Sequence, residues 1–503
     1  MGFYSRVVEL VIFHHHLLPG GVTTVIRQGV DALRAHSRRI SRIRVVAGRV
    51  PEKLSFPAGV EVVRLPEIDY SSPGPLDRIL WERRARHLAD VLMERFGDGG
   101  AVWWVHNYHL GKNPLFTDAV LRVAGMTDGP RLILQPHDFP EAGRYANLRA
   151  LDGTVKRPLY PLGLRVRYAL INQHDLGLLK NAGVPEPLLL LLENPVSPPP
   201  EAFTRSRDAE GSRSLHPTLL YPVRSIRRKN VLEAGMLLRL VDVPLRLIVT
   251  LPGVSRPERA YSAIVEEAFR SGLINGEFGT GARRAGVSLE QLAAACDMVV
   301  SSSVQEGFGY LFIQALQWGL PLLARRLDTF PDPRGLYDGY PSSFYSDFLC
   351  PLEPGERAAL LRRYRDKLRR IRKLAPAGVT ERLDHSLQQT FARDAVDFSF
   401  LDPGLQMRLL MAAAERSDFR TELRNLNSDL AEKLRASLSA HPGQRIQAVD
   451  GFFGLRAFAS RFDQLLGSFD QPQPAAETAR HEEVQKRMRA AFLDAQHLRI
   501  LLD

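Results

Sequence analysis

Two loops in the second half of the sequence carry residue types that suit a phosphorylated ligand. One follows the apolar run Met298–Ser301 and contains Glu306, Gly307, Phe308 and Gly309 before a helical pattern. Glycines let the backbone approach a ligand closely, and the unpaired N–H groups at a helix start attract anions. This loop therefore favours a site for an anionic ligand.

The second loop follows the expected strand Thr218–Val223 and is strongly basic. It contains Arg224, Lys229 and, between them, Arg227 and Arg228. An Arg fork and a Lys point charge both suit a phosphate group of a ligand. This loop therefore favours a phosphate contact, and we interpret the two intervening arginines as solvated or auxiliary.

Polar side chains also end two apolar runs in the first half of the chain. His106 and Asn107 follow one run, and His137 and Asp138 follow the next. The carboxyl ends of parallel strands line the ligand crevice of a doubly wound sheet. These four residues are therefore candidate site residues.

Three histidines and a glycine pair, His14–His16 and Gly20–Gly21, follow the first apolar run. Successive side chains of a strand point to opposite faces, so three histidines in a row make a poor metal site. We expect no bound metal. No G-x-G-x-x-G follows the run, which excludes a dinucleotide fingerprint.

Together these motifs resemble the donor-sugar motifs of glycosyltransferase family 4, a group of retaining transferases with the GT-B fold. In that family the loop acid, here Glu306, binds the donor sugar, and a second Glu eight positions later holds the ribose. Gln314 stands at the second position. A neutral amide in place of a carboxylate weakens such a contact by about tenfold in affinity, and does not abolish it.

The resemblance implies a division of roles among the site residues. Arg224 and Lys229 would stabilise the leaving diphosphate, while Glu306 and His137 orient the sugar. The donor would also contact Gly21 in the first glycine loop and the turn formed by Gly307, Phe308 and Gly309. The amide of Gln314 would bind its ribose.

The acceptor side of the site is expected at the first-half strand ends. The resemblance places His106, Asn107 and Asp138 there. The implied activity is transfer of a hexose from a nucleotide diphosphate sugar to a hydroxyl acceptor, with retention and without a metal or other cofactor. Leaving-group phosphate oxygen would take the acceptor proton.

Other activities remain open at this point. The same fold serves sugar phosphorylases and nucleotide-sugar epimerases, and a non-catalytic binding or scaffold protein could retain it. The sequence does not name the nucleotide base, the sugar or the acceptor. The segment Gly276–Gly286 is expected to border the base.

The elements that must position these residues alternate between strand-like and helical runs. Such alternation predicts an α/β fold with two doubly wound, Rossmann-like parallel sheets facing a cleft, followed by a helical extension. The expected domains are an N-terminal acceptor-side domain, a linker, a nucleotide-sugar domain and a helical extension that partly packs back on the first domain: 1–195, 196–217, 218–375 and 376–503.

Composition narrows the class of protein. The 503 residues are 45% hydrophobic and 24% charged, as in ordinary globular proteins. The chain has two cysteines, no spanning apolar run and no recognisable signal peptide, so we expect a cytoplasmic protein. The net charge of +11 suits phosphorylated partners.

A basic amphipathic helix is expected over 361–373, where eight basic residues accompany one acid. Its apolar stripe favours a helix that caps a domain, with a weak contact to anionic membrane as the open alternative. The partners expected from the sequence are the nucleotide-sugar donor and the hydroxyl acceptor, with no nucleic acid. The oligomeric state is not predicted.

Overall fold

The computed structural model describes residues 7–71, 77–98, 100–198, 216–283, 287–330, 335–440, 448–471 and 478–492. The chain divides into two compact units. Unit 1 comprises Met1–Ser197, Lys373–Val379 and Asp450–Leu493, and unit 2 comprises Pro198–Arg372, Thr380–Val449 and Asp494–Asp503. Most of the expected linker 196–217 and the last residues of Gly276–Gly286 lie outside the described residues.

Unit 1 is built on a parallel sheet. Its described strands number seven, in the order β3-β2-β1-β4-β5-β6-β7. They are β1 (Val8–His16), β2 (Ile40–Arg49), β3 (Val60–Arg64), β4 (Val102–His106), β5 (Arg131–Gln135), β6 (Val166–Leu170) and β7 (Leu189–Leu191). The central strands are buried on both faces, which explains why they appear in the sequence as continuous apolar runs.

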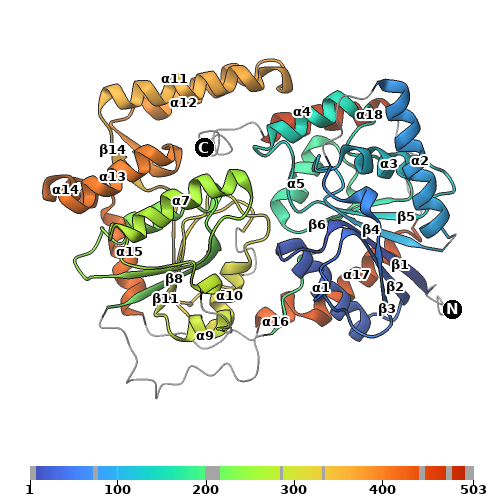
Figure 1. Cartoon of the computed structure of the whole chain (residues 1–503), viewed down its shortest axis with the longest axis horizontal. Helices are drawn as coiled ribbons and strands as arrows, with labels where there is room; N and C mark the ends of the chain where they lie inside the picture. Colours follow the sequence, from blue (N-terminus) through green and yellow to red (C-terminus); the bar gives the residue numbers. More distant parts are fainter. Residues whose placement is uncertain are drawn as a thin grey trace. The chain divides into compact units, whose positions relative to one another are not determined.

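Helices of unit 1 connect and cover these strands (Figure 1). They are α1 (Gly21–His36), α2 (Arg78–Phe96), α3 (Pro114–Ala124), α4 (Tyr145–Thr154), α5 (Gln173–Ala182), α17 (Leu455–Ser468) and α18 (Thr478–Phe492), with short 3₁₀ turns η1 (Pro66–Ile68) and η2 (Glu186–Leu188). Another helix, α16 (Ala448–Phe453), precedes α17.

Unit 2 repeats this architecture. Its described strands form a six-stranded parallel sheet in the order β10-β9-β8-β11-β12-β13, and a separate antiparallel pair. The sheet strands are β8 (Thr218–Arg224), β9 (Arg246–Leu251), β10 (Gly276–Phe278), β11 (Met298–Ser301), β12 (Leu322–Arg325) and β13 (Ser342–Tyr345). The pair is β14 (Leu349–Pro351) and β15 (Ala395–Asp397).

The helices of unit 2 fall into two groups. Those between the sheet strands are α6 (Val231–Leu237), α7 (Arg256–Arg270), α8 (Thr280–Arg283), α9 (Leu289–Ala294) and α10 (Tyr310–Trp318). Those after the sheet are α11 (Pro354–Ile371), α12 (Val379–Phe391), α13 (Pro403–Glu415), α14 (Ser417–Leu426) and α15 (Ser428–Ser439). The described 3₁₀ turns are η4 (Arg227–Lys229) and η6 (Phe398–Phe400), while η5 (Arg372–Leu374) begins in unit 2 and ends in unit 1.

Strand order reverses beside the first strand of each sheet. In unit 1 β1 lies between β2 and β4, and in unit 2 β8 lies between β9 and β11. Loops leaving the carboxyl ends on either side of such a reversal diverge and open a crevice, where doubly wound sheets bind ligands. The predicted α/β fold with two doubly wound sheets and C-terminal helices is confirmed.

Three of the strands, β13, β14 and β15, were not identified from the sequence. These strands have three or four residues each, which is too short to show an alternating pattern.

The C-terminal helix α17 belongs to the core of unit 1. Its Phe458 and Phe462 are fully buried in the same apolar cluster as β1 and α1, and Figure 1 shows α17 beside α1. The ring of Phe462 lies 5.0 Å from that of Trp104 on β4. A segment more than 250 residues away from the N-terminal sheet in sequence thus completes its packing.

The basic helix α11 packs its apolar stripe within unit 2. Leu360, Tyr364, Leu368 and Ile371 are buried, and the Tyr364 hydroxyl donates to the carbonyl of Phe400 at 2.8 Å. The stripe is therefore covered, as expected of a capping helix, and the charged face is the exposed one.

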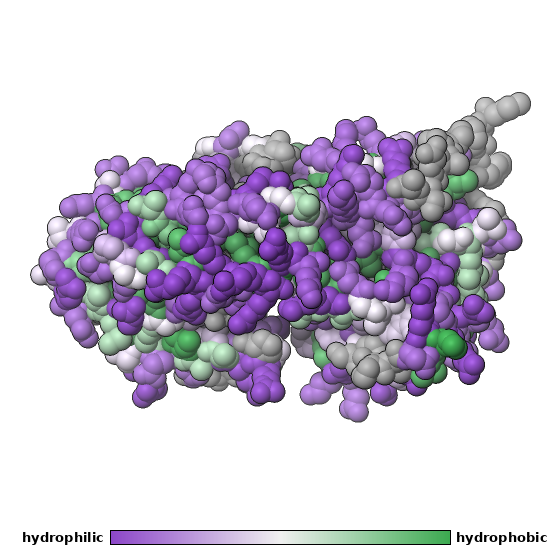
Figure 2. Space-filling view, turned by 90° about the horizontal axis from the view of Figure 1, so that it is seen from above, coloured by the Kyte–Doolittle hydropathy of each residue, from purple (hydrophilic) through white to green (hydrophobic). Residues whose placement is uncertain are grey.

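No helix in the described parts of the chain is long and apolar enough to cross a membrane. On the face shown in Figure 2, hydrophilic residues predominate and hydrophobic ones lie in small separate groups. Cys296 and Cys350 are buried free thiols.

Candidate functional site

The basic loop of unit 2 follows β8 and contains an unusual backbone position. After Arg224 at the strand end, η4 leads to Asn230, which has a left-handed φ of 50° and begins α6. Its side chain donates to Glu233 at 2.6 Å. Asn tolerates this conformation better than most residues, so Asn230 can turn the chain sharply after Lys229.

Hydrogen bonds join this loop to the loop after β11. The Tyr221 hydroxyl donates to the carbonyl of Lys229 at 2.7 Å and lies 2.7 Å from Ser303 Oγ. Ser302 Oγ donates to the carbonyl of Asn230 at 3.0 Å. The Val304 N–H also donates to the carbonyl of Arg228 at 2.9 Å. The two motifs identified in the sequence are therefore one structure at the strand-order reversal of unit 2.

Lys229 and Glu306 form an ion pair at the centre of this structure. Their side chains are only 14% and 15% exposed. Burial raises the pKa of Glu306, but the charges of Lys229 and Arg228 and the hydrogen bond from Lys229 outweigh it, so the pKa lies below its ordinary value. Glu306 is consequently an ionised hydrogen-bond acceptor at neutral pH.

The structure does not place Arg224 in this pair. Its guanidinium lies 3.9 Å from Glu258 at the start of α7, and its side chain is 36% exposed. Glu258 also closes the capping box of α7 with Ser255. Arg224 therefore lies at the same strand end as Lys229 but is turned toward a different helix.

The glycine turn before α10 depends on a left-handed residue. Gly309 has a φ of 78°, and a Cβ there would lie 2.7 Å from the Phe312 ring. Phe308 is buried with its ring 4.9 Å from that of Tyr310. Gln314 is half-buried one turn into α10, so the turn and the amide are carried by the same helix start.

Two residues outside the proposed phosphate-directed pair hold the basic loop in place. Arg227, interpreted from the sequence as solvated or auxiliary, is buried rather than solvated and donates to the carbonyl of Leu401 at 2.7 Å. The fully buried Gln406 of α13 donates to Asn230 Oδ1 at 3.0 Å. The C-terminal extension, in which the sequence showed no chemistry, thus supports the loop that carries Lys229. A basic residue beside a motif is a weak signal, and Gln406 gave none.

In unit 1 the predicted strand-end residues come together. His106 Nδ1 lies 2.9 Å from His137 Nε2, and the two rings are stacked. Asn107 has a left-handed φ of 52°, and its Oδ1 accepts from the N–H groups of His137 at 2.8 Å and Asp138 at 3.4 Å. Asn107 therefore ties the end of β4 to the end of β5.

The histidines of this region are neutral at pH 7. Burial lowers the pKa of His137 and of His15 to about 4, and lowers those of His14 and His106 well below the ordinary value. In the pair His106–His137 one neutral ring must donate and the other accept. Gly21 is exposed at the first position of α1.

Two acidic side chains, Asp138 and Glu141, follow β5 in the chain. Burial raises the pKa of Glu141 to about 7, and the Tyr160 hydroxyl donates to it at 3.0 Å. Asp138 forms an ion pair with Arg144 at 2.8 Å. No cluster of three or more metal-ligating side chains occurs among the residues that the structure describes.

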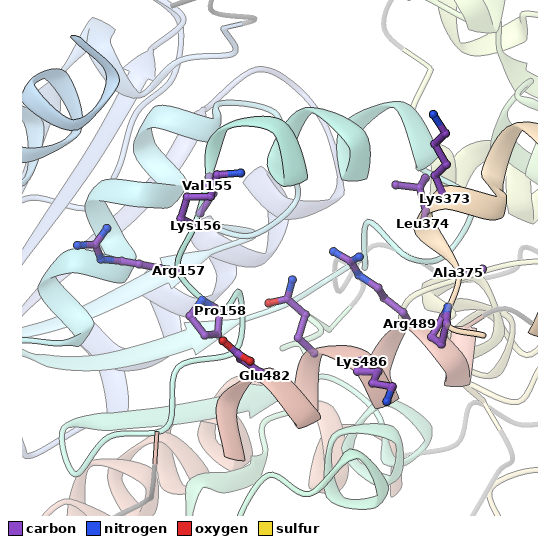
Figure 3. Close-up of a pocket in the computed structure, with 12 residues that line it drawn as sticks. Val155, Lys156, Arg157, Pro158, Lys373, Leu374, Ala375, Glu482, Lys486 and Arg489 are labelled. Carbon is purple, nitrogen blue, oxygen red and sulfur yellow. The ribbon is translucent and has the colours of Figure 1, made fainter. Parts of the chain in front are cut away.

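Unit 1 also contains a basic cavity of about 440 Å³, shown in Figure 3. It lies between the loop after α4, the segment 373–376 and α18. Arg489 points into the space between α18 and that loop and pairs with Asp152. The charged residues of its lining are Lys156, Arg157, Lys373, Lys486, Arg489 and Glu482. Lys373 ends the basic segment 361–373 described in the sequence, and the others were not candidates there because they lie in a loop and a helix without a recognisable motif.

Comparison with known proteins gives one relative of nearly full length. The mannosylglucosyl-3-phosphoglycerate synthase of Petrotoga mobilis is 31% identical over 481 residues, which cover 91% of each chain. No model of a protein family matches the sequence.

Solved structures agree on the fold. The sucrose-phosphate synthase of Thermosynechococcus elongatus has a TM-score of 0.50 at 13% identity, covering 92% of this chain and 98% of that one. Anabaena HepE in complex with UDP-glucose has a TM-score of 0.50 at 14% identity, covering 92% of this chain and 100% of the other. At these identities the likeness concerns the fold alone.

Proposed function

The chain belongs to the retaining GT-B glycosyltransferases, in the family of mannosylglucosyl-3-phosphoglycerate synthase, and from this premise we propose its substrates and the roles of its residues. It is a nucleotide-sugar-dependent glycosyltransferase. We propose that it transfers a mannosyl group from a nucleotide diphosphate sugar to a hydroxyl of glucosyl-3-phosphoglycerate, and that it needs no metal. The relative's product supports this choice of sugar and acceptor.

The observation that carries the proposal is the ion pair of Lys229 and Glu306 at the strand-order reversal of unit 2. A nucleotide diphosphate sugar presents two phosphates beside sugar hydroxyls. Lys229 supplies a cation for the phosphates, and Glu306 supplies an ionised acceptor for the hydroxyls. The loops after β8 and β11 together therefore bind both the phosphates and the sugar of the donor.

The reaction exchanges one C–O bond for another. The bond between the sugar C1 and the leaving phosphate oxygen breaks, the acceptor oxygen forms a bond to C1 on the same face, and a phosphate oxygen takes the acceptor proton. Lys229 and Arg224 stabilise the negative charge that grows on the diphosphate. Glu306 and His137 orient the sugar, and Gln314 binds the ribose.

Neutral histidines suit contacts with sugar hydroxyls, of the donor at His137 and of the acceptor at His106. His106 and His137 pair as one donor and one acceptor, so they can hydrogen-bond sugar hydroxyls without adding charge. Asn107 and Asp138 flank them at the ends of β4 and β5. The exposed Gly21 leaves backbone accessible at the start of α1.

A panel of donors and acceptors tests the proposal. GDP-, UDP- and ADP-linked mannose and glucose are incubated with glucosyl-3-phosphoglycerate, and the product is identified by mass spectrometry. We expect one mannosyl donor to give mannosylglucosyl-3-phosphoglycerate. Formation of sugar 1-phosphate from a glycoside and inorganic phosphate without nucleotide would instead indicate a phosphorylase. If no mannosyl donor gives product, the proposed substrates are wrong.

A further inference from the structure

Tyr70 lies where several strand-end loops of unit 1 meet. It follows η1 and is 44% exposed, and its ring lies 4.7 Å from that of His16 at the end of β1. Lys112, from the loop after β4, places Nζ 5.3 Å from the centre of the Tyr70 ring. The N–H of Ser71 donates to the carbonyl of Lys112 at 2.9 Å, which fixes the two loops together.

Two arginines from other strand ends lie near the same ring. Arg49 ends β2 and Arg144 precedes α4, and the charges of both act on the Tyr70 hydroxyl together with those of Asp69 and Asp138. Arg49 pairs with Asp69 at 2.8 Å and Arg144 pairs with Asp138 at 2.8 Å. The charges of three cations and two carboxylates therefore act at this tyrosine.

The carboxylates hold these arginines in place without covering them. The side chains of Arg49 and Arg144 remain 49% and 31% exposed. An Arg guanidinium has five N–H donors, so a carboxylate that takes one or two of them leaves others for a ligand. The Tyr70 hydroxyl adds a neutral donor, because burial raises its pKa above the ordinary value.

The backbone beneath the cluster is built for a close approach. A Cβ on Gly48, next to Arg49, would lie 2.3 Å from the backbone nitrogen of Asp69. Asn113 donates through Nδ2 to the carbonyls of Glu67 and Asp69, both at 2.8 Å. These contacts fix the end of β2, the Tyr70 loop and the start of α3 relative to one another, so the cluster is preorganised.

We propose that Arg49, Lys112 and Arg144, gathered around Tyr70, bind the phosphate and carboxylate groups of the acceptor. The inference rests on the proposed function, because that function supplies an acceptor with both groups. The cluster stands at the carboxyl edge of the unit 1 sheet beside His16, and its Lys112 and Arg144 lie on the loops that follow His106 and His137. Fork-shaped arginines and a lysine recognise phosphate and carboxylate by charge-assisted hydrogen bonds.

The basic cavity of Figure 3 is the alternative place for these groups. Its lining comes from the loop after α4 and from α18 rather than from the strand ends that carry the histidines. Its Arg157 pairs with the buried Asp118 at 3.2 Å, and its Arg489 pairs with Asp152. The exposed Lys486 of this cavity provides a matched control, because its replacement removes the same charge from the same unit.

The test compares two acceptors that differ only in the phosphate, glucosyl-3-phosphoglycerate and glucosylglycerate. For the wild type and for Lys112→Met, Arg144→Met and Lys486→Met, kcat/KM is measured with each acceptor. Loss of a charge-assisted contact is expected to lower the preference for the phosphorylated acceptor by about tenfold or more in Lys112→Met and Arg144→Met. Lys486→Met should keep the wild-type preference.

Two results would overturn the inference. One is an unchanged preference in both Lys112→Met and Arg144→Met. The other is a preference lost in Lys486→Met alone, which would assign the phosphate to the cavity of Figure 3. Circular dichroism shows that each variant is folded, and Arg144→Lys checks that charge at this position restores part of the preference.

A binding measurement separates this inference from the proposed function. Titration calorimetry with 3-phosphoglycerate needs no turnover. If the wild type makes no product but binds 3-phosphoglycerate about tenfold more tightly than Lys112→Met, the substrates proposed above are wrong and the anion site stands. If wild type and Lys112→Met bind it equally, the anion site is wrong whatever the activity.

Discussion

Lys229 and Glu306 show how one pair of side chains can handle two chemical groups. A buried carboxylate alone would have a raised pKa and would lose its charge more easily. The ammonium of Lys229 reverses this effect and keeps Glu306 ionised. The same ammonium is then available to a phosphate group. The proposed donor site therefore depends on the pair rather than on either residue alone.

Asn107 connects the two strand ends that carry His106 and His137. Its left-handed backbone suits Asn or Gly, and its Oδ1 accepts two backbone N–H groups. Asn107→Gly keeps the conformation but removes the acceptor, so we expect kcat to fall by about tenfold or more. Asn107→Asp retains an acceptor oxygen and should restore most of the activity. Steady-state kinetics of both variants measure this difference.

The contrary result for Asn107 would be equal kcat values for the Gly and Asp variants. The hydrogen bonds to His137 and Asp138 would then have no part in positioning the site. Thermal unfolding of both variants distinguishes such an outcome from a general loss of stability.

The residues proposed for the donor side are the ones that the sequence indicates most directly. Glu306, Gly307 and Gly309 lie within four consecutive positions, so local chemistry and the resemblance are enough to propose them. Gln406 could not be identified in this way, because it lies 176 residues from Asn230, which it contacts, and a lone Gln in a helix has no distinguishing pattern. Its role arises only when the chain folds.

Strands and helices also differ in how readily the sequence predicts them. The long buried strands β1, β4, β5 and β8 appear as apolar runs, and α1 shows helical spacing, so the sequence predicted them. The strands β10, β13, β14 and β15 have too few residues to show a period. The helix α17 has an ordinary amphipathic pattern, which gives no indication that its apolar face completes the core of unit 1.

Helix α13 supports the basic loop through Gln406. Gln406→Leu removes the shorter hydrogen bonds to Asn230 Oδ1 and to the carbonyl of Phe398, and leaves these acceptors only the longer bonds from Arg227 at 3.3 Å and from the Leu401 N–H at 3.2 Å. We expect the free energy of unfolding to fall by about 1–3 kcal/mol and KM for the donor to rise. Urea denaturation and donor kinetics measure the two effects.

The exposed Gln388→Leu is the control for Gln406→Leu, because it makes the same substitution on the surface of α12. It should leave donor KM unchanged. Equal donor KM values for Gln406→Leu and the wild type would show that α13 does not position the loop that carries Lys229.

At the scale of the whole molecule, unit 1 contains an acid-sensitive core. Five histidines, His14, His15, His106, His109 and His137, have pKa values lowered by burial, to about 4 for His15 and His137 and about 3 for His109. The unfolded chain binds protons at these groups from pH 6.5 downward, whereas the folded chain does not. Stability is therefore present above pH 6.5 and is lost as the pH falls toward 4.

The expected loss between pH 7 and pH 5 is about 2 kcal/mol for each histidine whose pKa falls from 6.5 to about 4. Glu141 acts in the opposite direction, since burial raises its pKa to about 7, and it offsets about one histidine. Urea denaturation at pH 7 and pH 5 measures the net effect. His15→Gln should reduce the loss, whereas the same change at the exposed His87 should not. A free energy of unfolding that does not fall toward pH 5 would contradict this account.

The basic residues behind the net positive charge gather in several places. They lie on the exposed face of α11, around Tyr70, in the cavity of Figure 3 and in the loop of Lys229. Only the last three lie in settings that can hold a small anion. A net charge therefore predicts phosphorylated partners without telling which residues bind them.

The most direct test of the central claim is the turnover of a mannosyl donor and glucosyl-3-phosphoglycerate by the wild type, Lys229→Met and Lys433→Met, with the product's anomeric configuration determined by NMR. Lys433 pairs with Asp429 on exposed surface, so its variant matches the charge change. We predict retention of the donor's configuration, a loss of about 100-fold or more in Lys229→Met, and wild-type turnover in Lys433→Met. An inverted product, or wild-type turnover in Lys229→Met, would contradict the account.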